Sequence, residues 1–223
     1  MTRPPLAAAG APAGRARHGL VLLHGRGGTG ADILSLLTRA GLPDVAARAP
    51  EAPGNSWWPT SFLAPAAQME PFVQAGLAAV AQAVADLRAG GLPLSRVWVA
   101  GFSQGACLAL EYAARSAATE GVAGAFGFSG GLVGTGDAAG GADPVLFGNR
   151  PKLFDYPGSL AGAQVYLSLH EDDPHIPASR AAQSADVLRS LQANVETRVF
   201  AGAGHAVMRE DIAALRQRLN AAA

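Results

Sequence analysis

Hydrophobic residues recur along this chain in two patterns, as short continuous runs and as longer stretches with apolar positions every three or four residues. Short runs rich in β-branched and aromatic side chains predict buried strands, and the helical spacing predicts amphipathic helices. We expect strands at 18–23, 45–49, 96–100, 121–128, 163–169 and 195–200. We expect helices at 29–40, 72–89, 106–115, 177–191 and 208–219.

Strands and helices therefore alternate from residue 18 onward. Because right-handed crossovers join successive parallel strands, this order predicts an α/β fold with a mostly parallel central sheet and helices on both faces. Two Gly- and Pro-rich stretches, 49–71 and 131–162, have no sustained period and are expected to be loops. We find no linker and no internal repeat, so residues 18–223 are predicted to form a single domain.

Residues 1–17 are rich in Ala, Pro, Gly and Arg and lack the apolar core of a secretory signal. We expect them to form a disordered leader on a cytoplasmic protein. No apolar run approaches the length of a membrane span, so we expect no stable membrane insertion. The 17 basic and 17 acidic residues balance, and no basic patch indicates nucleic-acid binding. The single cysteine excludes an internal disulfide, and a homodimer is compatible with the sequence.

The stretch 101–105, Gly-Phe-Ser-Gln-Gly, lies between a predicted strand and a predicted helix. The pattern G-x-S-x-G in this context is typical of a nucleophile elbow, in which a serine hydroxyl is exposed at a sharp turn. A second match, 127–131, contains Ser129, but the glycine-rich sequence after it cannot start a stable helix. Ser103 is therefore the candidate nucleophile, and Ser129 is expected to be a loop residue at a strand end.

A serine nucleophile needs a base to take its proton and a third group to orient that base. Of the five histidines, only His205 follows every plausible acid and lies in a glycine-flanked turn after a strand. His24 is expected to bond loop backbone near the site, and His18 to be solvated. Three carboxylates stand together at 171–173, and only one of them can orient the histidine. Asp173 precedes a proline, which favours extended backbone at the strand exit.

The candidates share one placement in the predicted sheet. Ser103, Asp173 and His205 each come just after a predicted strand, and sites in parallel sheets gather at the carboxyl ends of the strands. Acyl transfer to serine forms a tetrahedral oxyanion, which needs at least two pre-aimed donors. We expect these donors to be the backbone N–H groups of Gln104 and of Arg26, which lies in the loop after the first strand.

The same glycine-rich loop also matches the dinucleotide-binding pattern G-x-G-x-x-G at 25–30. That pattern requires an acidic residue about twenty positions further on, at the end of a second strand. Asp44 instead precedes its strand, and Glu51 lies in a Pro-rich loop. Nucleotide binding is therefore disfavoured.

The loop at 49–71 carries four large apolar side chains within a few residues of one another. They are Trp57, Trp58, Phe62 and Leu63. Trp57, Trp58 and Phe62 are candidate substrate-binding residues, because this cluster could form an apolar wall for an acyl or aryl group. Core packing beneath the loop is the alternative, and the sequence does not separate the two.

With these residues the chain resembles the phospholipase/carboxylesterase family of α/β-hydrolases, the acyl-protein thioesterase-like esterases. The resemblance covers roughly residues 18 to 220, and it implies an α/β-hydrolase fold without a large cap domain. It also implies a triad of Ser103, Asp173 and His205, with Arg26 and Gln104 lining the oxyanion hole. The motifs that carry it are LHGRGGTG at 23–30, GFSQG at 101–105, SGGL at 129–132, DPHIP at 173–177 and GAGH at 202–205. The last departs from the more usual Gly-Met-Gly-His, and the stretch 170–173 is unusually acidic.

The residues and the resemblance together predict a serine hydrolase. It would cleave small-molecule carboxylic esters, thioesters or lysophospholipids through an acyl-serine intermediate. No metal ion and no organic cofactor are expected. A non-catalytic protein of the same fold that binds a small molecule is the alternative interpretation. Transfer of the acyl group to an acceptor other than water is a third.

Overall fold

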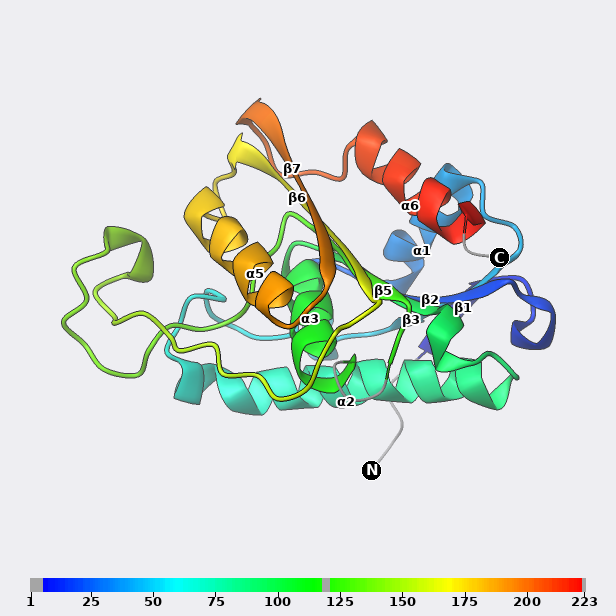
Figure 1. The fold of residues 1–223 in the computed structure, drawn as a ribbon, viewed down its shortest axis with the longest axis horizontal. Helices are drawn as coiled ribbons and strands as arrows, with labels where there is room; N and C mark the ends of the chain where they lie inside the picture. Colours follow the sequence, from blue (N-terminus) through cyan, green and yellow to red (C-terminus); the bar gives the residue numbers. More distant parts are fainter. Residues whose placement is uncertain (1–5, 118–120, 222–223) are drawn as a thin grey trace.

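The computed structural model describes residues 6–117 and 121–221. Its strands are β1 (Leu6–Gly10), β2 (His18–Leu23), β3 (Val45–Pro50), β4 (Val97–Phe102), β5 (Gly124–Phe128), β6 (Gln164–Asp172) and β7 (Asn194–Ala203). They form a seven-stranded sheet in the order β1-β3-β2-β4-β5-β6-β7 (Figure 1). All neighbouring strands are parallel except β1, which runs antiparallel to β3. The predicted α/β architecture is therefore confirmed.

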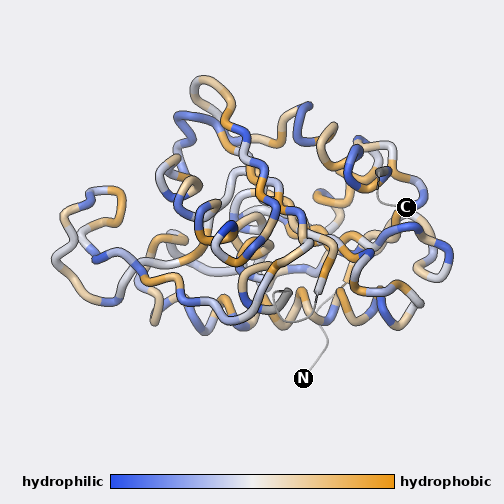
Figure 2. The backbone as a smooth tube through the Cα atoms, viewed as in Figure 1, coloured by the Kyte–Doolittle hydropathy of each residue, from blue (hydrophilic) through white to orange (hydrophobic). Residues whose placement is uncertain are grey.

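Helices cover both faces of the sheet. One face carries α1 (Gly30–Ala40) and α6 (Arg209–Ala221), and the other carries α2 (Ala66–Ala89), α3 (Gln104–Tyr112) and α5 (Ala178–Ser190) (Figure 1). Because strand side chains alternate between faces, Leu20 and Leu22 pack with α1 and α6, whereas Val21 and Leu23 pack on the other side. Hydrophobic and hydrophilic stretches alternate along the helices, as one buried face requires (Figure 2).

The helices α3 and α2 differ from the others, the first in its burial and the second in its length. Every residue of α3 is buried, because the helix lies against the sheet and beneath its neighbours. This position explains why its sequence, Gln-Gly-Ala-Cys-Leu-Ala-Leu-Glu-Tyr, is apolar almost throughout. The helix α2 is the longest element, yet none of the described helices is long and apolar enough to cross a membrane.

The beginning of the chain corrects one prediction. Residues 6–17 do not form a disordered leader, since β1 pairs along its whole length with β3 and a short 3-10 turn, Ala13–Arg15, follows it. The strand sequence Leu-Ala-Ala-Ala-Gly has no β-branched or aromatic residue, and its order comes from pairing at the sheet edge. The first five residues of the predicted leader lie outside the described part of the chain.

The start of α2 is a second correction. The spacing of the apolar residues predicts a helix from Phe72, but the helix begins at Ala66 and contains Pro71, although proline lacks an N–H and usually breaks helices. Its first turn is held from outside. The N–H of Ala66 donates to the carbonyl of Thr135 at 3.0 Å, and the N–H of Ala67 donates to the carboxylate of Asp137 at 2.7 Å.

His18 is also placed differently from the prediction. It is buried, with 1% of its surface exposed, and its Nδ1 lies 3.3 Å from the carbonyl of Arg96. The reason is the strand order, because β2 lies between β3 and β4 and both faces of the sheet are covered there. The strands β6 and β7 run about three residues further than predicted, to Asp172 and Ala203.

The stretch 131–162 is a long loop, as predicted, with one short 3-10 turn at Pro144–Leu146. Part of it projects from the body of the molecule (Figure 1). Ala139 and Asn149 bridge in antiparallel fashion, and the N–H groups of Gly140 and Gly141 both donate to the carbonyl of Gly148. Residues 140–148 therefore leave and rejoin the body at one place, and we call them the 140–148 excursion.

Candidate active site

Ser103 lies between β4 and α3 in the strained turn of a nucleophile elbow. Its φ is 54° and its ψ is −118°, a backbone conformation that side-chain-bearing residues rarely adopt. The flanking glycines are sterically required. A Cβ on Gly101 would fall within the backbone of Gly105, and a Cβ on Gly105 would fall within the backbone of Leu23. The serine hydroxyl is thereby fixed at the carboxyl edge of the sheet.

A chain of hydrogen bonds joins Ser103 to His205 and Asp173. Ser103 Oγ lies 2.8 Å from His205 Nε2, and His205 Nδ1 lies 2.8 Å and 3.0 Å from the two carboxylate oxygens of Asp173. A carboxylate only accepts, so the proton of the neutral imidazole is on Nδ1, and Nε2 accepts from the serine hydroxyl. The three side chains predicted to work together therefore meet.

The structure also distinguishes the three neighbouring carboxylates. The side chain of Asp173 is fully buried, and it accepts the backbone N–H groups of His175 and Ile176 at 2.8 Å and 3.0 Å. Glu171 and Asp172 are the last residues of β6, and both are exposed. Only Asp173 bonds His205, as the proline after it suggested.

Ser129, the serine of the second G-x-S-x-G match, takes no part in this arrangement. It follows β5, as predicted, and is buried with a φ of 52°. Its N–H donates to the carbonyl of Ser168, but its hydroxyl bonds no group among the described residues. The absence of a helix after Ser129 leaves its hydroxyl inside the protein.

Two backbone N–H groups next to the serine are open to an incoming group. Gln104 is the first residue of α3, and a helix has no internal acceptor for its first N–H groups. The N–H of Arg26 lies in the loop after β2, and within the described residues it makes no hydrogen bond. The Arg26 guanidinium is used elsewhere, because it donates to the carbonyls of Pro59 at 3.0 Å and Thr60 at 2.5 Å.

The side chain of Gln104 has a role that the sequence did not suggest. Its Oε1 accepts the N–H of Trp57 at 2.8 Å, and its Nε2 donates to the carbonyl of Trp58 at 2.8 Å. The amide thus pairs with the backbone of the loop as another strand would. The residue after the nucleophile therefore also fixes the aromatic loop that borders the site.

A cavity of about 660 Å³ opens beside Ser103. One wall comes from the loop after β3, with Trp58 and Phe62, and the floor includes Cys107 of α3. Phe102, Ile176 and Phe147 add to the apolar lining, the last from the 140–148 excursion and 71% exposed. The arrangement suits an apolar chain next to Ser103.

Trp57 is a correction to the predicted substrate-binding set. It does not line this cavity and is 5% exposed, with its indole N–H donating to the carbonyl of His24 at 3.0 Å. The His24 ring lies 5.3 Å from the indole, accepts the N–H of Ala52 at Nε2, and bonds the carbonyl of Gly25 through Nδ1. The loop therefore divides: Trp58 and Phe62 face the cavity, and Trp57 packs behind them. The backbone-bonding role predicted for His24 is correct.

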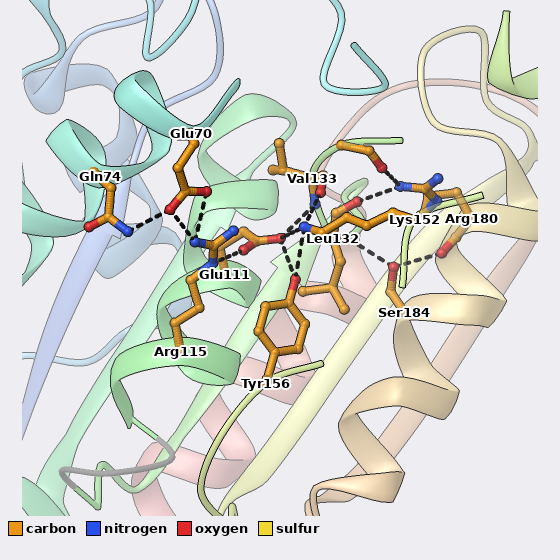
Figure 3. A network of polar contacts seen from close by, with 11 residues as sticks. Glu70, Gln74, Glu111, Arg115, Leu132, Val133, Lys152, Tyr156, Arg180 and Ser184 are labelled. Carbon is orange, nitrogen blue, oxygen red and sulfur yellow. Dashed lines mark hydrogen bonds and ion pairs between the residues drawn. The ribbon is translucent and has the colours of Figure 1, made fainter. Parts of the chain in front are cut away.

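Sequence reasoning missed a buried ionic network at the far end of α3 (Figure 3). Its hub is Glu111, a fully buried carboxylate that binds Arg115 on the next turn and accepts the hydroxyl of Tyr156 at 2.9 Å. Arg115 in turn binds both carboxylate oxygens of Glu70, at 2.7 Å and 2.9 Å. The signal that could have found it is a Glu and an Arg four residues apart in an otherwise apolar helix.

This network holds the backbone segment that follows β5. The N–H of Val133 donates to Glu111 at 2.7 Å, and its carbonyl accepts from Lys152 at 2.7 Å (Figure 3). Arg180 donates to the carbonyls of Leu132 and Gly134 at 2.9 Å and 2.6 Å. Because the N–H of Gly134 donates to the carbonyl of Phe62, the network also supports the wall of the cavity.

Burial controls the ionisation of several side chains around α3. Burial raises the pKa of the Cys107 thiol to about 12, so this thiol stays protonated at neutral pH. Burial lowers the pKa of Lys152 despite the attraction of Glu111. Within the described residues, no three His, Cys, Asp or Glu side chains lie close enough together to hold a metal ion.

A parallel sheet with a strained serine at one strand end, and an aspartate and a histidine at later strand ends, defines an α/β-hydrolase. The order Ser103, Asp173, His205 along the chain is the order of that class. The chain belongs to the phospholipase/carboxylesterase family, whose model matches residues 6–142. This is a family of esterase-type hydrolases.

Solved structures agree with that assignment. A phospholipase/carboxylesterase from Dyadobacter fermentans is 36% identical over 97% of this chain and 96% of its own, with a TM-score of 0.83. Esterase PE8, 24% identical over the full length of both chains, and a carboxylesterase from Mesorhizobium loti, 19% identical over 98% and 99%, share the fold with TM-scores of 0.74 and 0.68. Comparison with curated proteins finds no match.

Proposed function

We propose that this esterase-type hydrolase cleaves carboxylic esters with Ser103 as nucleophile, His205 as general base and Asp173 as the orienting acid. The observation that carries the proposal is the continuous hydrogen-bond chain from Ser103 Oγ through His205 to a buried carboxylate. That chain ends in a cavity large enough for a small ester. The reaction needs no metal ion and no organic cofactor.

Acylation begins when His205 Nε2 takes the hydroxyl proton of Ser103 as Oγ attacks the ester carbonyl. The carbonyl oxygen becomes an oxyanion, which accepts the N–H groups of Arg26 and Gln104. The bond to the leaving oxygen then breaks, and the imidazolium returns its proton to that oxygen. Asp173 holds Nδ1–H throughout, and its charge stabilises the transient imidazolium.

Deacylation repeats the same sequence with water as the nucleophile. His205 takes a proton from water, the hydroxide attacks the acyl-serine carbonyl, and Ser103 leaves with the proton that the imidazolium returns. The products are a carboxylic acid and the regenerated hydroxyl. Thioesters and lysophospholipids fit the same chemistry, because each presents an acyl carbonyl with a sulfur or oxygen leaving group.

Two variants test the proposal with two reagents. Ser103→Ala should lose both p-nitrophenyl ester hydrolysis, by several orders of magnitude, and labelling by a fluorophosphonate probe. Ser129→Ala should keep both, because its buried hydroxyl does not contact His205. Hydrolysis that survives Ser103→Ala would refute the assignment of the nucleophile. A wild-type protein that neither hydrolyses esters nor takes the label would instead be a binding protein of this fold.

Water is the acceptor in this proposal, and product analysis tests it. Turnover of an ester in the presence of an added alcohol should yield mainly the free acid. A transesterified product in large excess over the acid would identify the protein as an acyltransferase. Ser103→Ala would abolish hydrolysis and acyl transfer alike. The variant therefore tests the nucleophile, and the product analysis tests the acceptor.

A further inference from the structure

Three arginines gather in a second cavity between α1 and α6, away from Ser103. The cavity has a volume of about 390 Å³ and is lined by Arg39, Arg209 and Arg216 together with Ile212 and Ala213. Among the described residues, no carboxylate lines it. We call these three residues the arginine cluster. Like charges repel, so their gathering without a counter-charge is unfavourable unless an anion joins them.

Helix stability explains only part of the arginine cluster. Arg216 Nε donates to the carbonyl of Ala40 at 2.6 Å and so serves the C-terminus of α1, where Arg39 also suits the helix dipole. Arg209, in contrast, is the first residue of α6, where a cation is unfavourable. In the described part of the chain, neither Arg39 nor Arg209 forms an ion pair.

A groove joins the arginine cluster to the candidate active site. A third cavity, of about 420 Å³, is lined by Phe102 and His205 at one end and by α1 side chains up to Arg39 at the other. It shares Arg39 with the cluster and His205 with the cavity beside Ser103. At 1.5 Å per residue, the part of α1 that lines the groove, from Asp32 to Arg39, is about 10 Å long.

The two sides of His205 correspond to the two parts of an ester. Ser103, Trp58 and Phe62 line the apolar cavity, which suits the acyl part, and none of them lines the groove. His205 lines both spaces, and in the proposed reaction it returns its proton to the leaving group. The leaving group therefore lies on the groove side, and the groove leads it toward the arginine cluster.

We infer that the preferred substrate is an acyl ester or thioester whose leaving alcohol or thiol carries a phosphate at its far end, bound by Arg39 and Arg209. The inference rests on the proposed function. A guanidinium presents paired donors that match phosphate oxygens. A spacing of about 10 Å along α1 requires a long tether between the reacting carbonyl and the phosphate.

The acids near the groove are accounted for. The Asp32 carboxylate accepts the N–H and the hydroxyl of Thr29 at 3.0 Å and 2.7 Å, in the capping box of α1. Asp211 is buried and binds Tyr166 and the N–H of Met208. Glu210 is exposed beside Arg209. Because Asp32 lines the groove itself, an anion is favoured beyond it, at Arg39, and not next to His205.

Two matched substrate pairs test the inference and its spacing. The long pair is S-butyryl-4′-phosphopantetheine and S-butyrylpantetheine, and the short pair is 1-butyrylglycerol 3-phosphate and 1-butyrylglycerol. Each pair differs by one phosphate. In the wild type, kcat/KM should favour the phosphorylated member of the long pair by about tenfold, the effect of two partly exposed ion pairs. The short pair should show little preference, and a phosphate preference confined to it would overturn the spacing.

The variant Arg39→Gln/Arg209→Gln should reduce the long-pair ratio to about one, whereas Arg88→Gln, an exposed arginine of α2 on the opposite sheet face, should leave it unchanged. Raising the salt concentration should lower the wild-type ratio. A wild-type ratio of one, with both thioesters still cleaved, overturns this inference and leaves the proposed esterase function intact.

A binding measurement makes the inference independent of turnover. Calorimetric titration of the Ser103→Ala variant should detect tighter binding of 4′-phosphopantetheine than of pantetheine, and adding the two arginine substitutions should remove the difference. Equal affinities for the two compounds would refute the phosphate site even if no thioester were hydrolysed. If the wild type cleaves no thioester but the variant binds 4′-phosphopantetheine more tightly than pantetheine, the proposed function alone is refuted.

Discussion

Asp173 uses one carboxylate for two purposes. Its oxygens accept two backbone N–H groups of the loop that follows β6, and they also accept the Nδ1–H of His205. The loop bonds fix the carboxylate, and the carboxylate fixes the tautomer of the imidazole. The orientation of the His205 ring therefore depends on a loop that begins with an Asp-Pro sequence.

An amide at this position would present the wrong tautomer to Ser103. We expect Asp173→Asn to lower kcat by about three to four orders of magnitude, as is general for triad acids. Asp172→Asn and Glu171→Gln are matched controls, and each should reduce kcat only slightly, because neither carboxylate bonds His205. Steady-state kinetics of the three variants at one pH checks this. A lower kcat for the Asp172 variant than for the Asp173 variant would mean that Asp172, and not Asp173, orients His205.

Cys107 lies beneath the cavity, four residues after Ser103, yet burial suppresses the reactivity of its thiol. Burial raises the pKa of its thiol to about 12, and the thiolate is the reactive form. We expect iodoacetamide to leave Cys107 unmodified in the folded protein up to about pH 9, while a fluorophosphonate labels Ser103 in the same sample. Mass spectrometry detects both, and guanidinium should expose the thiol. Rapid alkylation of the folded protein would contradict the burial.

At the scale of elements, the 140–148 excursion contributes one side chain to the site. Phe147 is 71% exposed and lines the cavity beside Ser103, so its removal costs the core nothing. An apolar chain that extends past Trp58 and Phe62 would contact it. One end of the cavity beside Ser103 is therefore formed by a loop outside the main body of the fold.

Phe147→Ala should lower kcat/KM for a medium-chain ester by about fivefold, roughly the worth of one aromatic contact of about 1 kcal/mol, and leave a short acetyl ester unaffected. Leu153→Ala is the control, because Leu153 is 90% exposed and does not line the cavity. The ratio of the two esters for each variant decides the matter. An equal fall for both esters would indicate disturbance of the catalytic residues instead.

The strand and helix pattern could be predicted from the sequence because most elements are amphipathic or fully buried. The first strand could not, since its small residues carry no strand propensity and only the neighbouring β3 makes them a strand. The first turn of α2 could not be predicted either, because the acceptors for its N–H groups lie far away in the sequence, at residues 135–137. In both places, contacts distant in sequence override local preference.

Much the same division holds for the site. The contact between Ser103, Asp173 and His205 could be predicted because each follows a strand in the known order of the class. The side-chain role of Gln104 and the hub at Glu111 could not, because both depend on which backbone groups the folded chain leaves unpaired. Trp58 lines the cavity and Trp57 does not. The sequence cannot distinguish them, because the two residues are adjacent and identical.

For the molecule as a whole, the buried Glu111 network makes stability depend on charge balance. Glu111 is fully buried and faces both Arg115 and Lys152, so removing its charge leaves Arg115 with Glu70 alone and Lys152 without an ion-pair partner among the described residues. The Arg115 guanidinium also holds Glu70: burial opposes ionisation there, but the hydrogen bonds from Arg115 and Gln74 keep the pKa of Glu70 below its usual value. Glu70 is 44% exposed at its side chain, however.

Glu111→Gln should therefore destabilise the protein by about 3–5 kcal/mol, the usual effect of breaking a buried pair. Glu70→Gln, in the same network but partly solvated, should cost under about 1 kcal/mol. Urea unfolding of both variants measures the difference. Equal costs would mean that the interior around Glu111 is hydrated and that the network contributes little to stability.

The 140–148 excursion has a consequence for how this scaffold can change. Ala139 and Asn149 stand opposite each other, so a segment between them can grow without separating the elements on either side. Each doubling of a loop costs only about 0.6 kcal/mol in closure entropy. New chain inserted there would emerge beside Phe147, which lines the cavity next to Ser103. The fold thus has a built-in site for acquiring a cap, by which an open enzyme could become a selective one while its sheet stays the same.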